Sequence, residues 1–367
     1  MKRTLTALFF LLVILYNGAA QADAAAAAVI EEKTGRVLYA VHEDAELPMA
    51  STTKIMTALL AIDHCDLNET VVAGENAYGV PGTSIYLEKG EELSLEQMLY
   101  GLLLASGNDA AVAIAEHVAG SVEEFAGMMN DRALSLGCEH THFNTPHGLP
   151  AAKHYTSALD LCRIAREAMS RPAFRQIVST QRALIPWQGH GADRVLNNKN
   201  RLLSTYPGAL GIKTGYTKAA GRCLAFAAER EGMTLIGCVL NCPDWFDHSA
   251  AMLDQVFDEY HMYQALSAGE IVYRLPVEGG VEEGVDLIAA ETLSVPLRAE
   301  ETAELSFRWP QSRAAGFAAG EMLGEASLSV NGEPLYTIPL IAAKGVAKST
   351  FLTGIERLGN AWLLWAE

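Results

Sequence analysis

Short, dense runs of apolar residues occur near both ends of the first 260 residues, and this pattern predicts buried β-strands. Two such runs, residues 26–31 and 37–41, flank Lys33-Thr34-Gly35-Arg36, a polar stretch typical of a hairpin turn. Further strands are predicted at residues 183–187, 209–214, 222–229 and 233–240.

The residues between these strands follow the helical period. From Ile55 onward, segment 51–62 is apolar on almost every face, which predicts a helix enclosed by protein. Segment 105–109 places short polar groups between two helices. A hairpin at the start, helices in the middle and strands near the end predict an α+β fold, in which helices pack on an antiparallel sheet. The other helices are expected at residues 95–104, 110–118, 122–136, 157–169 and 249–260.

The pattern changes near residue 265. Residues 270–340 contain short alternating segments with turns at Gly279-Gly280 and Asn331-Gly332, which predict a small, acidic all-β domain resembling a β-sandwich. The tail, residues 349–367, carries one apolar stripe and is expected to form an amphipathic helix. It would lie on a membrane surface, or dock on the β-domain or a partner. The stripe consists of Phe351, Ile355, Leu358, Trp362 and Trp365, and the expected boundaries are 23–264, 265–347 and 348–367.

Residues 1–22 have the layout of a secretory signal, with Lys2 and Arg3 before an apolar run and small residues before the expected cleavage site. Cleavage is expected after Ala22, with Ala24 as the alternative. The working protein is therefore expected outside the cytoplasm, attached to the outer face of the cytoplasmic membrane. Its 27 basic and 44 acidic residues give a net charge of −17, which excludes the electrostatic footprint of a nucleic-acid binder.

The six cysteines are scattered, show no Cys-x-x-Cys spacing and mostly lie within apolar runs. They are interpreted as small core residues. The compartment permits a disulfide but the spacing does not require one. Neither a metal site nor a cofactor is predicted. The cysteines are Cys65, Cys138, Cys162, Cys223, Cys238 and Cys242.

Ser51 and Lys54 are three residues apart at the start of the enclosed helix, so an amine would reach a hydroxyl one turn away. A free lysine is neutral only about once in 2500 molecules at pH 7, roughly 4.6 kcal/mol against its acting as a base. Burial and a second cation nearby would reduce that cost. The alternative for an isolated Ser-x-x-Lys is a helix cap followed by a solvated lysine.

Three short motifs occur in order along the chain: Ser51-Thr52-Thr53-Lys54, Ser106-Gly107-Asn108 and Lys213-Thr214-Gly215. Such a set is found in penicillin-recognising serine enzymes. Ser329-Val330-Asn331 and Lys33-Thr34-Gly35 are second copies of the weaker motifs. Lys33 is interpreted as a solvated turn residue, whereas Lys213 is expected at the end of a strand.

With these motifs the chain closely resembles the low-molecular-weight penicillin-binding proteins of the serine D-alanyl-D-alanine carboxypeptidase type. The likeness extends over residues 25–260, and the β-domain and tail match the family layout more loosely. It includes Pro48 to Thr57, Ser106 to Ala111, Thr141 to Leu149, His154 to Ala158 and Gly211 to Thr217.

The resemblance implies a role for each motif residue. Ser51 would attack the carbonyl between two D-Ala residues and form an acyl-enzyme, Lys54 would accept its proton, and Ser106 would pass a proton to the departing amine. Asn108 would hold Lys54 or the substrate amide, while Lys213 and Thr214 would bind the terminal carboxylate. Gly215 would let the strand approach the substrate. The backbone N–H groups of Ser51 and Tyr216 would form an oxyanion hole. Lys213 would also keep Lys54 neutral.

Two segments depart from the family pattern. Family members commonly have arginine where this chain has Lys199, and lysine lacks the planar fork of a guanidinium. Many also carry an arginine just after the last strand of the sheet, where this chain has Asp-Trp-Phe-Asp-His at residues 244–248. The binding of the substrate carboxylate is therefore expected to be weaker or rearranged.

The expected partners are peptidoglycan stem peptides ending in D-Ala-D-Ala, with β-lactams as covalent inhibitors. A β-lactamase shares the acylation machinery. Class A enzymes add a deacylating glutamate between the second and third motifs; the matching region here, residues 154–161, offers Asp160 but follows the carboxypeptidase pattern instead. A DD-endopeptidase cutting cross-links is a second alternative. A non-catalytic wall-binding protein is a third, from a different functional class.

Overall fold

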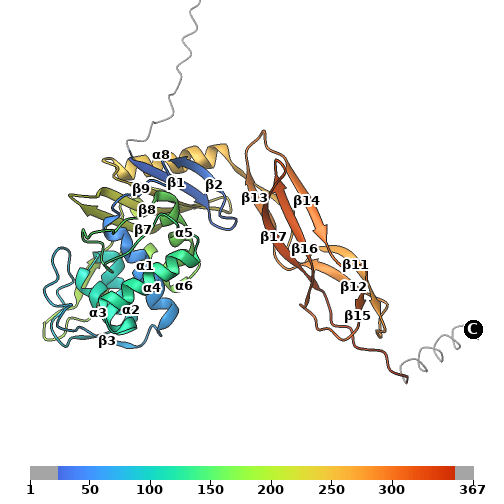
Figure 1. The fold of residues 1–367 in the computed structure, drawn as a ribbon, viewed down its shortest axis with the longest axis horizontal. Helices are drawn as coiled ribbons and strands as arrows, with labels where there is room; N and C mark the ends of the chain where they lie inside the picture. The colour runs from blue at the N-terminus through green and yellow to red at the C-terminus, as the bar shows by residue number, and fades with distance from the viewer. Residues whose placement is uncertain (1–23, 352–367) are drawn as a thin grey trace, which may run out of the picture.

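The computed structural model describes residues 24–351 and consists of two bodies, a mixed helix-and-sheet body followed by an elongated β-domain (Figure 1). The predicted α+β class of the first body and the all-β character of the second are confirmed. The expected signal at residues 1–22 and most of the expected amphipathic tail lie outside the described residues.

A five-stranded antiparallel sheet with the order β2-β1-β9-β8-β7 forms the centre of the first body. All six residues of β1 are buried, because α8 covers one face of the sheet and the other helices cover the opposite face (Figure 1). Strand β7 is the last strand in this order, so it lies at an edge of the sheet. The strands are β1 (Ala26–Glu31), β2 (Val37–Val41), β7 (Ala209–Thr217), β8 (Gly221–Arg230) and β9 (Met233–Leu240); two small hairpins pair β3 (Thr70–Val72) with β4 (Glu92–Ser94) and β5 (Arg182–Ile185) with β6 (Arg194–Asn197).

The helices lie mainly where the apolar period predicts them. Serine caps begin several of them: Ser121 accepts the N–H of Glu124, and Ser157 accepts that of Asp160. Helix α6, which begins with Pro172, was not predicted, although proline at the first helical position is a common start signal. The helices are α1 (Lys54–His64), α2 (Leu95–Tyr100), α3 (Asn108–Ala119), α4 (Val122–Ser135), α5 (Ala158–Met169), α6 (Pro172–Ser179), α7 (Leu202–Thr205) and α8 (Trp245–Glu259).

Two local predictions were wrong. Helix α1 does not begin at Ser51, because residues Ala50–Thr53 form a tighter 3-10 turn and Ala50 has a positive φ of 49°. Lys213 does not end a strand, since β7 continues to Thr217 through pairing with β8. The second difference arises from pairing with a segment that lies outside the predicted strand.

The β-domain contains a six-stranded sheet with the order β14-β16-β17-β12-β11-β15 and a two-stranded sheet of β10 and β13. Apolar residues of β10 and β13 pack with those of β16 and β17 in one core, and a second core lies further along the domain. The strands are β10 (His261–Leu266), β11 (Ile271–Glu278), β12 (Gly284–Ala289), β13 (Leu293–Leu297), β14 (Ala303–Arg308), β15 (Arg313–Ala314), β16 (Met322–Val330) and β17 (Glu333–Ala342).

The β1–β2 hairpin turn contacts the β-domain. Lys33 donates from Nζ to the carbonyl of Thr292 and lies 3.5 Å from Glu291, so its interpretation as a solvated turn residue was wrong. Next to it Arg36 pairs with Glu301 and donates to the carbonyl of Pro296. This copy of Lys-Thr-Gly therefore helps to join the two bodies.

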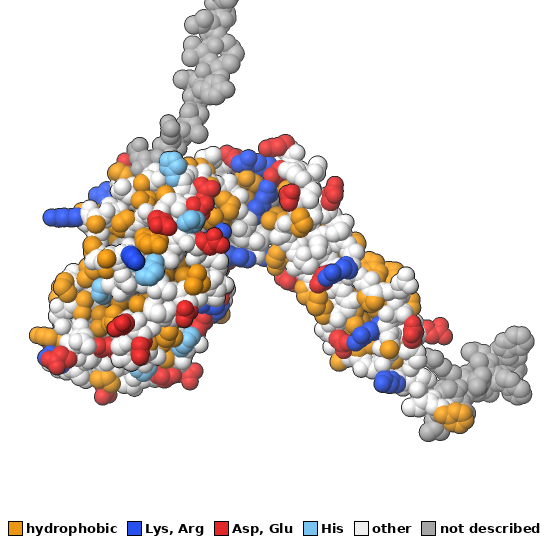
Figure 2. All heavy atoms as spheres, in the orientation of Figure 1, with side chains coloured by type: hydrophobic (Ala, Val, Ile, Leu, Met, Phe, Trp, Pro, Cys, Tyr) orange, Lys and Arg blue, Asp and Glu red, His pale blue; other side chains and the backbone are white. Residues whose placement is uncertain are grey.

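On the face shown in Figure 2, acidic and basic side chains are interspersed over both bodies. Among residues 24–351, none of the helices combines the length and the apolar character needed to cross a bilayer.

Candidate active site

Ser51 and Lys54 lie side by side at the start of α1. The 3-10 turn exposes the Ser51 side chain partly, whereas Lys54 is 0% exposed. Lys54 Nζ is 3.0 Å from Ser51 Oγ, 2.7 Å from Asn108 Oδ1 and 2.6 Å from the carbonyl oxygen of His147. The amine is therefore surrounded by three oxygen atoms and has no access to solvent.

Burial lowers the pKa of Lys54 well below its usual value, because a charged ammonium loses its hydration there. The positive charges of Lys213 and Lys199 lower the pKa further, and Asp109 partly opposes them. Lys54 is therefore biased toward the neutral amine, the form that accepts a proton. Lys199, the residue that departs from the family pattern, contributes its charge to this effect.

Ser106 and Asn108 lie at the interruption between two helices. A π-type turn at Gly101–Ala105 ends the α2 segment, and Ser106 adopts a left-handed φ of 67°. Asn108 begins α3 and donates from Nδ2 to the carbonyl of Pro81 at 2.7 Å, which orients its Oδ1 toward Lys54. The loop around residue 82 fixes this carboxamide.

Strand β7 brings the third motif against the Ser51 turn. A Cβ added to Gly215 would lie 3.0 Å from Ser51 N and 3.0 Å from Met49 O, so a larger residue would push the strand away. Lys213 is 1% exposed and donates from Nζ to the carbonyl of Thr214 at 2.9 Å. Thr214 is also buried, and Tyr216 is 62% exposed at the rim. The structure thus brings all three motifs together.

The loop 144–149 and His154 support the site, although no role was predicted for them. The carbonyl of His147 faces Lys54, and that of Pro146 accepts the hydroxyl of Thr57 at 2.6 Å. His154 lies 2.9 Å from Thr53 Oγ1 and accepts the N–H of Asn144 at 3.0 Å. Every residue has a backbone carbonyl, so the contact of the His147 carbonyl cannot be predicted from the residue type. Only the resemblance to family segments pointed to this loop.

The two histidines of this support are expected to remain neutral in mild acid. Burial lowers the pKa of His147 to about 4, and the charges of Lys54 and His154 lower it further. Burial also lowers the pKa of His154 to about 4, with smaller contributions from the charges of His142 and Lys54. The unfolded chain binds these protons from about pH 6.5 downward. The free energy of unfolding should therefore fall as the pH drops from 6.5 to 4.

Ring-proton NMR titration would measure both pKa values directly. Thermal unfolding of His154→Asn, which keeps an acceptor for Asn144 but carries no titratable group, should depend less steeply on pH over the same range. Histidine signals that titrate near pH 6.5 in the folded protein would contradict the prediction.

Within the described part of the chain, one group of three side chains has the spacing of metal ligands: Cys65, Glu69 and His117. Burial, with Glu69 and Asp66, raises the pKa of the Cys65 thiol, which disfavours the thiolate that a metal needs. The six cysteines, all within residues 24–351, form no disulfide in the structure, and five of them are buried. The group lies apart from the Ser51 turn and carries no role in the site.

A serine next to a buried lysine, at the edge of an antiparallel sheet, fits the class of serine acyl-transfer enzymes. The comparisons with known proteins specify the family. Residues 15–244 match the family described as D-alanyl-D-alanine carboxypeptidase, and residues 260–348 match the C-terminal domain of penicillin-binding protein 5. The chain therefore belongs to the D-alanyl-D-alanine carboxypeptidase family.

Individual relatives span nearly the whole chain. D-alanyl-D-alanine carboxypeptidase DacF of Bacillus subtilis is 33% identical over 353 residues, covering 93% of this chain and 90% of that protein. DacC of Escherichia coli is 30% identical, with 93% and 87% coverage. The crystal structure of penicillin-binding protein 5 from Haemophilus influenzae has a TM-score of 0.72 at 25% identity, covering 89% of this chain and 98% of that one.

Proposed function

We propose that this chain removes the terminal D-Ala from peptidoglycan stem pentapeptides, with Ser51 as the nucleophile and Lys54 as the general base. One observation carries the assignment: the desolvated amine of Lys54 lies 3.0 Å from Ser51 Oγ, and its other two neighbours are carbonyl oxygens. Membership of the D-alanyl-D-alanine carboxypeptidase family supports the substrate class.

The reaction would proceed in two steps through an ester. Ser51 Oγ attacks the carbonyl between the two D-Ala residues as Lys54 takes its proton, and the backbone N–H groups of Ser51 and Tyr216 stabilise the oxyanion. Ser106 passes a proton to the leaving amine of D-Ala, which breaks the peptide bond. Water then cleaves the ester and regenerates Ser51. Asn108 orients Lys54 throughout.

The third motif would hold the substrate. The open edge of β7 allows an extended peptide to lie beside Gly215, close to the Ser51 turn. Lys213 and Thr214 lie next along the strand and would take the terminal carboxylate. Lys213 would also help to keep Lys54 neutral, since its charge lowers the pKa of Lys54.

The position of Asp160 argues against a β-lactamase. Its carboxylate accepts the N–H of His140 at 2.8 Å and the hydroxyl of Thr141 at 2.9 Å, and it pairs with Arg163 at 2.7 Å. With these partners it is 0% exposed and is not free to activate a water for deacylation. Slow loss of a penicillin adduct would agree with this assignment, whereas rapid turnover would favour the β-lactamase.

Mass spectrometry of the protein after incubation with a β-lactam would test the assignment. We expect one adduct per chain, mapped to the tryptic peptide that contains Ser51, together with release of D-Ala from a pentapeptide. Comparing the pentapeptide with a cross-linked dimer would distinguish a carboxypeptidase from a DD-endopeptidase. The absence of both adduct and D-Ala release would favour a non-catalytic wall-binding role.

The site of action would be outside the cytoplasm, where peptidoglycan is found, in agreement with the family's substrate. Attachment to the membrane would depend on residues 349–367, most of which lie outside the described residues. Deleting this segment should release the protein from membranes and leave its activity on a soluble peptide unchanged. Full retention on membranes after the deletion would contradict the tail as anchor.

A further inference from the structure

A cavity of about 890 Å³ opens beside the loop that precedes the second motif, and its volume lies within the range of about 300–1,000 Å³ typical of small-molecule sites. Two segments line it, one between β3 and β4 and the other in the loop between β5 and β6. Four residues contribute aromatic rings to the lining: Tyr78, Tyr86, Trp187 and His190.

Two tyrosines present their rings to solvent at this cavity. Tyr86 is 72% exposed and Tyr78 is 56% exposed. Tyr86 also has a left-handed φ of 60°, which bulky residues rarely adopt. Its N–H donates to Ser84 Oγ at 2.8 Å, and its carbonyl accepts from Arg194 Nη2 at 3.0 Å, so contacts on both sides hold this conformation. A strained backbone that fixes an exposed ring indicates a binding role for that ring.

The loop between β5 and β6 adds a second flat surface. His190 stacks on Trp187, with ring centroids 4.1 Å apart and an interplanar angle of 25°. The guanidinium carbon of Arg194 lies 5.0 Å from the centre of the Trp187 ring, and Arg194 pairs with the buried Glu91. The stacked pair is therefore held in place from the protein side.

The charges in the lining cancel. Among the described residues, Glu88 and Lys89 are its one acid and its one permanent base. Glu88 lies 3.1 Å from His190 Nε2, and Lys89 pairs with Glu75. The cavity therefore favours neither an anion nor a cation. A neutral ligand with an apolar face and polar edges fits such a lining, and a pyranose sugar has this character.

The cavity adjoins the candidate active site at Gly82, where an added Cβ would lie 2.8 Å from Asn108 Nδ2. Lys54 links Asn108 to Ser51 through contacts of 2.7 and 3.0 Å. In peptidoglycan the amino terminus of the stem peptide is joined to a glycan strand. The four residues before the scissile bond extend roughly 14 Å, at about 3.6 Å each, so a sugar joined to them would reach the cavity.

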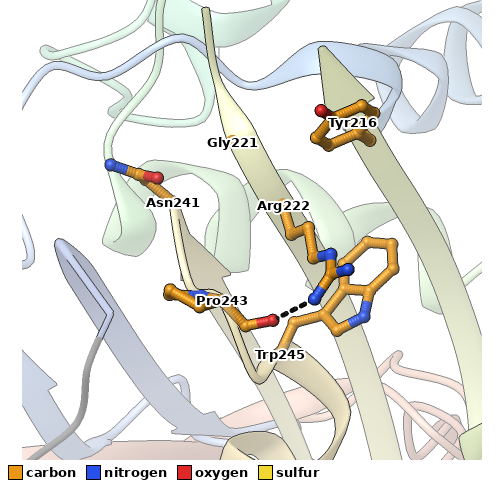
Figure 3. Close-up of a pocket in the computed structure, with 6 residues that line it drawn as sticks. All are labelled: Tyr216, Gly221, Arg222, Asn241, Pro243 and Trp245. Atoms are coloured by element: carbon orange, nitrogen blue, oxygen red, sulfur yellow. Dashed lines mark hydrogen bonds between the residues drawn. The ribbon is translucent and has the colours of Figure 1, made fainter. Parts of the chain in front are cut away.

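A second cavity, of about 580 Å³, opens on the other face of the central sheet and lacks this connection. Figure 3 shows Arg222 in its lining, extending from β8 toward Pro243. The next residue, Cys223, faces the Ser51 turn, because its Sγ donates to the carbonyl of Pro48 at 3.7 Å. Successive side chains of a strand point to opposite faces, so Arg222 points away from that turn.

We propose that the cavity at Tyr78 and Tyr86 binds a sugar of the glycan strand that carries the stem peptide. The inference rests on the proposed function, because it places the scissile bond at Ser51. The two tyrosine rings would pack on the apolar faces of the sugar, and the polar groups of the lining would bind its edges. The enzyme would therefore prefer stem peptides that are still attached to glycan over free stem peptides.

The release of D-Ala from two substrates would test the proposal: a GlcNAc-MurNAc disaccharide that carries the pentapeptide, and the same pentapeptide without sugars. In wild type, kcat/KM should be higher for the disaccharide substrate. Tyr86→Ala should lower this value about three- to tenfold, mainly through KM, and change that for the free pentapeptide less than about twofold. Tyr78→Ala should act in the same direction, and Tyr86→Phe, which keeps the ring, should retain the preference.

Tyr263→Ala is the matched control, because it removes a tyrosine that is 45% exposed on β10 and should leave both rates unchanged. Acylation by benzylpenicillin, which carries no sugar, should keep its wild-type rate in Tyr86→Ala and Tyr78→Ala. Equal losses on both substrates would show that the cavity supports the peptide site, and a wild type without preference would exclude a sugar site; either result overturns the inference. Wild-type protein that releases D-Ala from neither substrate would instead refute the proposed function.

Discussion

Replacing Ser51 with alanine is expected to abolish both the β-lactam adduct and the release of D-Ala. The substitution would remove the oxygen atom that we propose forms the ester, and the remaining groups would have to act through a water molecule. Losses for nucleophiles of this type justify an expected fall in kcat of at least about 10⁴-fold. Release of D-Ala from the pentapeptide and mass spectrometry of the intact protein would measure the two effects.

A lysine in the other Lys-Thr-Gly copy provides the control. Lys33 contacts the β-domain through the carbonyl of Thr292, away from the Ser51 turn. Lys33→Ala should therefore still form the β-lactam adduct and still release D-Ala. Ser51→Ala should also unfold at nearly the wild-type temperature, because it deletes one partly exposed hydroxyl. An Ser51→Ala protein that still forms a stable adduct would show that a different residue is acylated.

Much of the fold follows from local sequence. Segment 26–31 contains only apolar residues before its last position and becomes a strand buried on both faces. The helices predicted at residues 122–136 and 157–169 begin at Val122 and Ala158, directly after the serine caps Ser121 and Ser157. The predictions fail where contacts with a distant segment determine the local structure. The edge strand β7 extends to Thr217 because β8 pairs with it, and the residues of segment 209–217 do not by themselves indicate this pairing.

The candidate site was predictable in its residues but not in its geometry. Three motifs of three or four residues identify side chains, whereas the backbone that positions them is invisible in the sequence. Ala50 and Ser106 both adopt positive φ angles, although neither is a glycine. The carbonyl of His147 is one of the three neighbours of Lys54, and a carbonyl belongs to every residue. The Lys-Thr-Gly motif at Lys33 shows that a motif alone does not define a site, because this copy contacts the β-domain instead.

The neighbours of Lys54 indicate how its protonation state is used. A neutral amine has two N–H donors and one lone pair. The Asn108 and His147 carbonyl oxygens only accept, so they would take the two N–H groups. The lone pair would then face Ser51 Oγ at 3.0 Å, in position to receive its proton. An ammonium would donate to all three oxygens and leave the serine unactivated.

Lys54→Arg should therefore be nearly as inactive as Lys54→Met. Arginine keeps the positive charge but does not lose its proton at accessible pH, so it offers the serine no lone pair. Loss of a general base lowers rates by about 10²- to 10⁴-fold, and we expect both variants in this range for acylation by a β-lactam. Stopped-flow measurement of the acylation rate would compare them with wild type.

The pH dependence separates loss of the base from misfolding. In wild type the acylation rate should rise with pH as Lys54 loses its proton, since burial lowers its pKa well below the usual value. The residual rate of Lys54→Met should lack this rise, and its unfolding temperature reports the integrity of the fold. Lys89→Arg, at an exposed lysine that pairs with Glu75, controls for the substitution itself and should keep the wild-type rate. Retention of more than about a tenth of the wild-type rate by Lys54→Arg would show that the charge of Lys54, rather than its neutral amine, serves catalysis.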